Sequence, residues 1–136
     1  MKNRVFPADM EYWEDVVGFL ELCLEPVNVS EMFKDEVMMA LEETFTNIAS
    51  YAYEAETGNV EITCGMSGED TDEFMISLKD WGTPYNPLKR PDPDFSIPFE
   101  EREIGGLGIY MVKKYMDRVE YRYEDDCNIL TIGKKL

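Results

Sequence analysis

A run of glycines near the C-terminal end is the feature that most constrains this chain. Residues 104–116 place Gly105, Gly106 and Gly108 within four positions and continue at once in an apolar helical pattern. A glycine-rich loop that leads into a helix presents backbone N–H groups without intrahelical partners, together with the positive end of the helix dipole. Both features suit an anion such as phosphate. Glycines also mark helix starts and tight turns for structural reasons alone, so both interpretations stay open at this point.

The length and the charge of the chain narrow the possible partners. With 136 residues, the chain suits one domain with one core, and we expect a single domain over residues 1–136. Its 29 acidic and 13 basic residues give a net charge of −16. This charge argues against nucleic acid and against an anionic membrane surface as partners. A bound phosphate would have to be held by local features, and a divalent cation would help.

Two residue types bear on chemistry and location. The sequence contains no histidine, which excludes histidine bases, histidine metal sites and a phospho-accepting histidine. Cys23, Cys64 and Cys127 lie far apart in no metal-type spacing, and we expect free thiols in a reducing compartment. No signal peptide is visible, and no stretch approaches the ~18 apolar residues of a membrane span. These observations favour a cytoplasmic protein without a membrane partner.

Hydrophobic periodicity predicts the order strand, helix, helix, strand, strand, loop, helix, strand, strand. The expected helices cover residues 10–24, 31–53 and 107–116, and the expected strands cover residues 3–6, 60–64, 74–81, 119–123 and 129–132. Asp9 and Ser30 are the expected N-caps of the first two helices. Successive hairpins with grouped helices indicate an α+β two-layer sandwich, in which a mainly antiparallel mixed sheet carries its helices on one face.

The segment from residue 82 to residue 103 has no regular periodicity and contains five prolines. A loop of this length inside a compact domain is more often a lid or a binding loop than simple slack. A proline-stiffened surface loop is the alternative.

Two polar residues on the second helix form the first candidate site. Glu43 and Asn47 are four positions apart and therefore share one face, roughly opposite the apolar stripe of that helix. One interpretation is a solvated acidic face, to which Glu36 and Glu54 also belong. The other is a base beside a cation ligand, because Mg²⁺ prefers hard oxygen donors.

A second candidate site follows the strand that ends near residue 80. Asp80 comes directly before the turn sequence Gly82-Thr83-Pro84. Turn chemistry alone is one explanation for a carboxylate at this point. A carboxylate at the edge of the sheet can also accept a hydrogen bond from an exocyclic amine, and adenine is a fitting partner.

Taken together, these stretches resemble three sequence boxes in their order and rough spacing: Glu43 with Asn47, then Asp80 with Gly82 and Pro84, then residues 105–108. The boxes belong to the ATP-binding fold shared by gyrase-type ATPases, Hsp90, histidine kinases and MutL proteins. Within that group, residues 42–48 and 80–87 look like those of the bacterial anti-sigma-factor serine/threonine kinases. The resemblance covers nearly the whole chain.

The resemblance implies a role for each candidate residue. Glu43 matches the base that activates the attacking hydroxyl, Asn47 matches the magnesium ligand, and Asp80 matches the acceptor for the adenine amino group. Residues 87–104 match a mobile ATP lid. The further implied ATP contacts are Gly82 and Pro84 beside the base, Gly105, Gly106, Leu107 and Gly108 in the phosphate loop, and Arg102, for which an ordinary surface arginine is the alternative.

The activity implied by the resemblance is in-line transfer of the γ-phosphoryl group of ATP, with Mg²⁺, to a serine or threonine of a partner. Such relatives phosphorylate a small anti-sigma antagonist domain and, in another state, sequester a sigma factor, usually as a homodimer. Two departures leave turnover open: Tyr51 stands where many relatives have histidine, and Pro84 stands where some have a second glycine. The alternatives are a nucleotide-dependent binding module with negligible transfer and an acidic interaction domain without nucleotide.

Overall fold

The structure, a computed structural model, describes residues 1–54, 58–68, 72–98, 100 and 107–136. Five strands form one sheet in the order β1-β2-β3-β5-β4. Their bounds are β1 (Lys2–Pro7), β2 (Asn59–Met66), β3 (Glu73–Asp80), β4 (Arg118–Glu124) and β5 (Cys127–Lys135). All four pairings between these strands are antiparallel, so the described sheet is not mixed.

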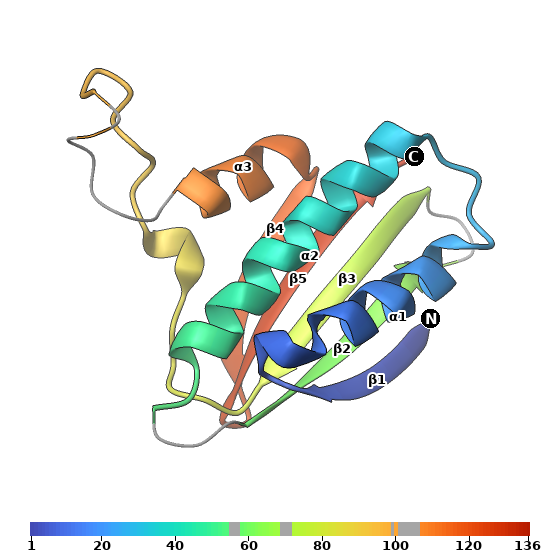
Figure 1. The fold of residues 1–136 in the computed structure, drawn as a ribbon, viewed down its shortest axis with the longest axis horizontal. Coiled ribbons are helices and arrows are strands. Elements are labelled where there is room, and N and C mark those ends of the chain that lie inside the picture. Colours follow the sequence, from blue (N-terminus) through green and yellow to red (C-terminus); the bar gives the residue numbers. More distant parts are fainter. Residues whose placement is uncertain (55–57, 69–71, 99, 101–106) are drawn as a thin grey trace.

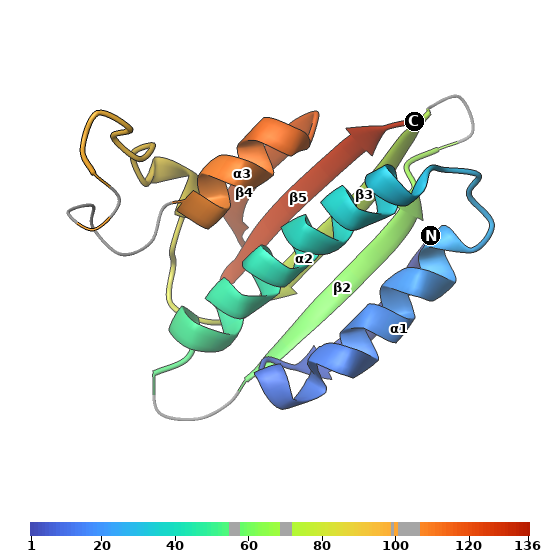
Figure 2. The same cartoon turned by 45° about the horizontal axis from the view of Figure 1, so that its top comes forward.

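The described residues form three α-helices, and Figures 1 and 2 show that the helices cover one face of the sheet. They are α1 (Trp13–Leu24), α2 (Glu31–Tyr51) and α3 (Leu107–Tyr115). α2 runs along the middle of the layer, with α1 on the side of β2 and α3 on the side of β4. The predicted α+β two-layer sandwich is therefore confirmed. None of the helices within the described ranges is both long enough and apolar enough to cross a membrane.

The two expected N-caps are present, but one of them caps a different element. The Ser30 hydroxyl accepts a hydrogen bond from the Phe33 N–H at 3.1 Å, which fixes the start of α2. The Asp9 carboxylate accepts from the Glu11 N–H at 2.9 Å and caps a single 3₁₀ turn, η1 (Met10–Tyr12). The first α-helix consequently begins at Trp13 rather than at residue 10.

The core lies between the sheet and the helix layer. Alternation along β3 buries Phe74, Ile76 and Leu78 on the inner face. Leu41 and Phe45 of α2 are also fully buried, and each such side chain contributes roughly 1.5–3 kcal/mol relative to an exposed position. The packed layers hold the C-terminal half of α2 above the end of β3, where the candidate site lies.

The cysteines correct one expectation from the sequence. Cys23 of α1 and Cys64 of β2 form a disulfide, with their Cα atoms 6.2 Å apart. Only Cys127, which is buried, is a free thiol in the described chain. The expectation of three free thiols was wrong because the packing of α1 on β2 brings together two residues separated by 41 positions.

The last hairpin differs in one detail that matters for the site. Asp125 and Asp126 have positive φ values of 53° and 60° and make the tight turn between β4 and β5. Asn128, which the sequence placed in this turn, belongs instead to β5 and pairs with Asp80 of β3.

Candidate functional site

Asp80 is a buried carboxylate at the end of β3. The strand alternation that buries Leu78 places Asp80 on the same inner face, where its side chain is only 4% exposed. One oxygen, Oδ1, accepts hydrogen bonds from the Gly82 N–H and from the Asn128 Nδ2, both at 2.9 Å. The other oxygen, Oδ2, makes no hydrogen bond with the described residues. Every fully buried side-chain nitrogen or oxygen among the described residues has a hydrogen-bond partner. Because Oδ2 has none, it is not fully buried and is accessible from the space beside it.

Burial controls the ionisation of this group. Loss of hydration raises the pKa of Asp80 above its ordinary value, and the hydrogen bonds from Asn128 and Gly82 work in the opposite direction. A strand end with a buried carboxylate that has one free oxygen is well suited to accept a hydrogen bond from a ligand.

Asp80 lines a pocket between α2, β3, β5 and the loop after β3. The pocket is open to solvent and has a cavity volume of about 40 Å³, smaller than the ~300–1,000 Å³ of sites that enclose a whole ligand. Its lining comes from α2 and its C-cap (Thr44, Asn47, Ile48, Tyr51, Ala52), from β3 to β5 (Asp80, Tyr121, Asn128, Leu130) and from the loop (Thr83, Tyr85, Pro87). The pocket is mainly apolar with a few polar groups, which suits a flat aromatic ring.

The loop that follows Asp80 is packed tightly against the end of α2. A Cβ at Gly82 would overlap with the backbone carbonyl of Ala52, and the Thr83 N–H donates to that carbonyl at 3.0 Å. Gly82 is thus required for close approach to Ala52. Pro84 is exposed and does not line the pocket, whereas its neighbours Thr83 and Tyr85 do.

Asn47 and Glu43 lie on the side of α2 that faces α3 and the pocket. Both are half-buried, so the alternative of a fully solvated acidic face does not hold for them. Asn47 lines the pocket. Glu36, which was expected on the same face, is engaged with Lys134 at 2.7 Å, and Glu54 is exposed.

Glu43 lies against the first turn of α3. A Cβ added to Gly108 would overlap with the Glu43 carboxylate, so the two helices approach closely only because residue 108 is glycine. Burial raises the pKa of Glu43, while the Asn47 side chain and the charge of Arg90 lower it. Arg90 follows the loop's 3₁₀ turn, η2 (Pro87–Lys89), and the sequence pattern did not single it out.

Part of the expected phosphate loop and lid can be placed. Gly108 and Leu107 open α3, and Leu107 is 39% exposed. Arg102, Gly105 and Gly106 lie outside the described residues, as do residues 99 and 101–104 of the expected lid.

The described part of the expected lid contacts α3. Lys113 of α3 pairs with Asp92 at 2.7 Å, and the ring of Tyr110 lies 5.2 Å from that of Phe95. Asn86 caps η2 through the Leu88 N–H at 2.9 Å. This segment is therefore more ordered than its lack of periodicity suggested.

The oxygen donors fit a magnesium ion that arrives with a phosphate ligand. The described residues contain no group of three or more acidic, cysteine or histidine side chains able to hold a metal alone. Mg²⁺ is commonly bound by only one or two protein oxygens together with phosphates and water. The amide oxygen of Asn47, one turn from the Glu43 carboxylate, meets that requirement.

Comparison with known proteins agrees with this geometry. A family model described as a histidine kinase-like ATPase domain matches residues 6–134. Serine-protein kinase RsbW of one Bacillus cereus strain is 30% identical over 98 residues, which are 71% of this chain and 61% of that protein. The protein of the same name from Bacillus thuringiensis subsp. konkukian matches to the same extent. The matched segment spans less than two thirds of the length of these curated relatives.

Proposed function

Because the chain belongs to the histidine kinase-like ATPase domain family, we propose that it is an ATP-binding regulatory protein kinase of the anti-sigma-factor type. It transfers the γ-phosphoryl group of ATP to a serine or threonine hydroxyl of an antagonist protein. The observation that carries this proposal is the free Oδ2 of buried Asp80 in a pocket that Asn47 also lines. Similarity to proteins named serine-protein kinase RsbW supports the same function.

Each part of the candidate site has its own role in this proposal. Asp80 accepts a hydrogen bond from the adenine amino group, and Ile48 and Leu130 contact the ring from the pocket walls. Asn47 would hold the Mg²⁺ that accompanies ATP, through its amide oxygen. The first turn of α3 at Gly108 binds phosphate oxygens through its free N–H groups, together with the loop residues Gly105 and Gly106 and the side chain of Arg102.

Glu43 is the proposed base. It accepts the proton of the attacking hydroxyl as the oxygen bonds to the γ-phosphorus, while the bond from that phosphorus to the bridging oxygen breaks and ADP leaves. Mg²⁺, when bound, would neutralise charge on the phosphates. A base must be ionised to act, and burial raises the pKa of Glu43 while Asn47 and Arg90 lower it. The raised pKa makes the ionised carboxylate a stronger base, and Asn47 and Arg90 limit the rise.

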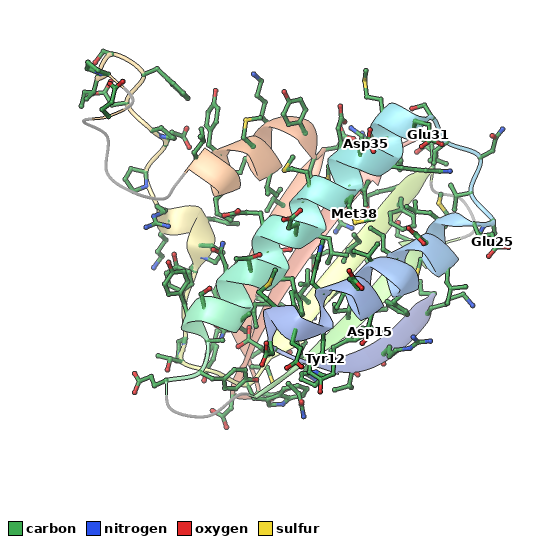
Figure 3. All side chains as sticks on the ribbon, in the orientation of Figure 1. Tyr12, Asp15, Glu25, Glu31, Asp35 and Met38 are labelled. Atoms are coloured by element: carbon green, nitrogen blue, oxygen red, sulfur yellow. A yellow bond between two sulfur atoms is a disulfide. The ribbon has the colours of Figure 1, made fainter. Side chains whose placement is uncertain are left out.

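The surface of the helix layer fits the proposed partners. Figure 3 shows Asp15, Glu25, Glu31 and Asp35 on α1 and α2, and all four are exposed. Between residues 9 and 54 the only basic residue is Lys34, which pairs with Glu31 at 3.6 Å. Such a surface complements a basic patch on a protein and repels nucleic acid. We assign it to a sigma factor, which the kinase sequesters as a homodimer.

The proposal places the protein in the cytoplasm, where ATP is available. The Cys23–Cys64 disulfide differs from the reduced thiols that are usual in that compartment. Counting the free thiols before and after reduction tests that pairing directly.

A nucleotide-dependent binding module without transfer is the second candidate. It is favoured by one observation: Glu43 packs against the start of α3 and does not line the pocket. In this alternative the protein binds ATP or ADP and engages its partner through the lid.

Phosphoryl transfer to a serine-bearing antagonist domain, measured with radiolabelled ATP and Mg²⁺, separates the two candidates. The kinase proposal predicts labelling by the wild type and at least about a hundredfold slower labelling by Glu43→Gln, within the range for a general base. Glu42→Gln, an exposed neighbour, is the matched control and should transfer normally. Labelling at the wild-type rate by Glu43→Gln would remove Glu43 from the mechanism. Tight ATP binding with no labelling would favour the binding module.

A further inference from the structure

Asn128 is a buried amide that no sequence pattern singled out. It lies near the start of β5, directly across from Asp80 of β3, and is 6% exposed. Its Nδ2 donates to Asp80 Oδ1 at 2.9 Å and to the Thr83 carbonyl at 3.0 Å, with a longer contact of 3.4 Å to the Gly82 carbonyl. Its Oδ1 accepts from the Tyr85 N–H at 3.0 Å and from the Tyr121 hydroxyl.

These contacts use the whole hydrogen-bonding capacity of the side chain. An asparagine amide has two N–H donors and an oxygen with two lone pairs. One N–H of Asn128 is directed to Asp80 and the other to the loop carbonyls, while the two lone pairs receive Tyr85 and Tyr121. Asn128 therefore has no group left for a ligand, although it lines the pocket. Any effect on binding must act through Asp80 and the loop.

The hydrogen bonds that Asp80 already accepts indicate how Asn128 affects ligand binding. Asn128 and the Gly82 N–H both bind Oδ1, so only Oδ2 is available to a ligand. A carboxylate with two free oxygens can receive two parallel N–H groups, as it does with arginine. The N1–H and N2–H groups of guanine form such a pair. Adenine presents a single amino group on its Watson–Crick edge, and one free oxygen is sufficient for it.

On the basis of the proposed ATP-binding function, we propose that Asn128 is the positioning residue of the base pocket and that it sets the preference for adenine over guanine. It does so by binding Oδ1 of Asp80 and by fixing residues 82–85 through their backbone. Tyr121 supports this role because its hydroxyl fixes the orientation of the Asn128 amide.

Ionisation of Asp80 supplies an independent readout. The hydrogen bond from Asn128 lowers the pKa of Asp80 against the effect of burial. Two tyrosines lie near this carboxylate, Tyr53 after α2 and Tyr121 of β4, and burial together with the charge of Asp80 raises their pKa values above 10.0. Both are therefore uncharged at neutral pH. Substitution of Asn128 should therefore raise the pH below which protonation of Asp80 weakens nucleotide binding.

The test uses two substitutions of the full chain. Asn128→Ala removes the amide, and Tyr121→Phe removes only the hydroxyl that orients it. Tyr123→Phe, on the same strand but 43% exposed, is the matched control. Affinities for non-hydrolysable ATP and GTP analogues are measured over a pH series, with thermal melting to verify folding. If Asn128→Ala does not fold, Tyr121→Phe carries the same test.

We expect Asn128→Ala to bind the ATP analogue about tenfold more weakly or worse, because Asp80 and residues 82–85 lose the amide that positions them. The ratio of ATP to GTP affinity should fall, and the pH below which binding is lost should rise. Tyr121→Phe should show the same changes to a smaller degree, and Tyr123→Phe none. Wild-type affinity and selectivity in folded Asn128→Ala would overturn this inference alone. Failure of the wild type to bind either analogue would overturn the proposed function with it.

Discussion

The carboxylate of Glu43 on α2 lies directly against the backbone of Gly108 in the first turn of α3. The proposed base and the proposed phosphate-binding turn are therefore in contact, and the contact exists because residue 108 has no side chain. A substitution at this glycine should act on the chemistry at the phosphate end and leave the base pocket, which is lined by other residues, unaffected.

Gly108→Ala tests this separation. The added methyl group would overlap with the Glu43 carboxylate, so either the carboxylate or α3 must move. We expect phosphoryl transfer to fall at least about tenfold, since a displaced catalytic group is costly even for small shifts. Adenosine, which lacks phosphates, should bind unchanged; this can be measured by calorimetry.

Gly18→Ala is the control for that experiment. Gly18 lies within α1, and a Cβ there meets no atom within 4 Å. Alanine should stabilise the helix by roughly 0.5–1 kcal/mol. If Gly108→Ala transferred phosphate as fast as Gly18→Ala, the contact with Glu43 would have no catalytic meaning.

The transfer rate should depend on pH through Glu43. Burial raises the pKa of this carboxylate above its ordinary value of 4.5, so protonation inactivates the base at a higher pH than it would for an exposed glutamate. Single-turnover transfer should therefore decline as the pH falls through that raised pKa. The rate should stay level above it. A rate that stayed level down to the ordinary pKa would contradict the burial effect.

The substitution Asp80→Asn should abolish nucleotide binding without lowering the stability of the folded protein. Burial raises the pKa of Asp80 above 3.8, so the folded protein binds this proton more tightly than the unfolded chain. The contribution of this proton to the free energy of unfolding is fully present below pH 3.8, and it is lost as the pH rises through the raised pKa of Asp80. An asparagine side chain at position 80 still has an oxygen that can accept hydrogen bonds from Asn128 and from the Gly82 N–H, and it carries no charge. At neutral pH the variant should thus melt at the same temperature as the wild type or higher, and a much lower melting temperature would contradict this.

The presence of the disulfide can be tested by counting free thiols. Alkylation of the unfolded protein without reductant should label only Cys127, and after reduction it should label three cysteines. A loop closed over 41 residues limits the unfolded chain, so reduction should lower the free energy of unfolding by about 4 kcal/mol. Three labelled thiols before reduction would show that the bond is absent from the isolated protein.

Much of the fold and part of the site could be predicted from the sequence because their signals are local. The helical spacing of Glu43 and Asn47 and the position of Asp80 at the end of an alternating strand both reflect short-range periodicity. The structure places Asn47 and Asp80 on the same pocket, while their roles stay predictions.

The residues that the sequence did not reveal depend on contacts between distant parts of the chain. Asn128 is 48 positions from Asp80 and meets it only because β5 inserts between β3 and β4. In the sequence it closely follows two aspartates and looks like part of their turn. The pairing of Cys23 with Cys64 likewise requires α1 to pack on β2. No pattern within one element contains that information.

Calorimetric titration of the wild type and of Asp80→Asn with a non-hydrolysable ATP analogue, with and without Mg²⁺, tests the central claim most directly. The account predicts that the wild type binds the analogue, that Mg²⁺ strengthens binding, and that the folded Asp80→Asn variant loses it. Absence of binding to the wild type, or equal binding by Asp80→Asn, would contradict the assignment of this pocket to adenine.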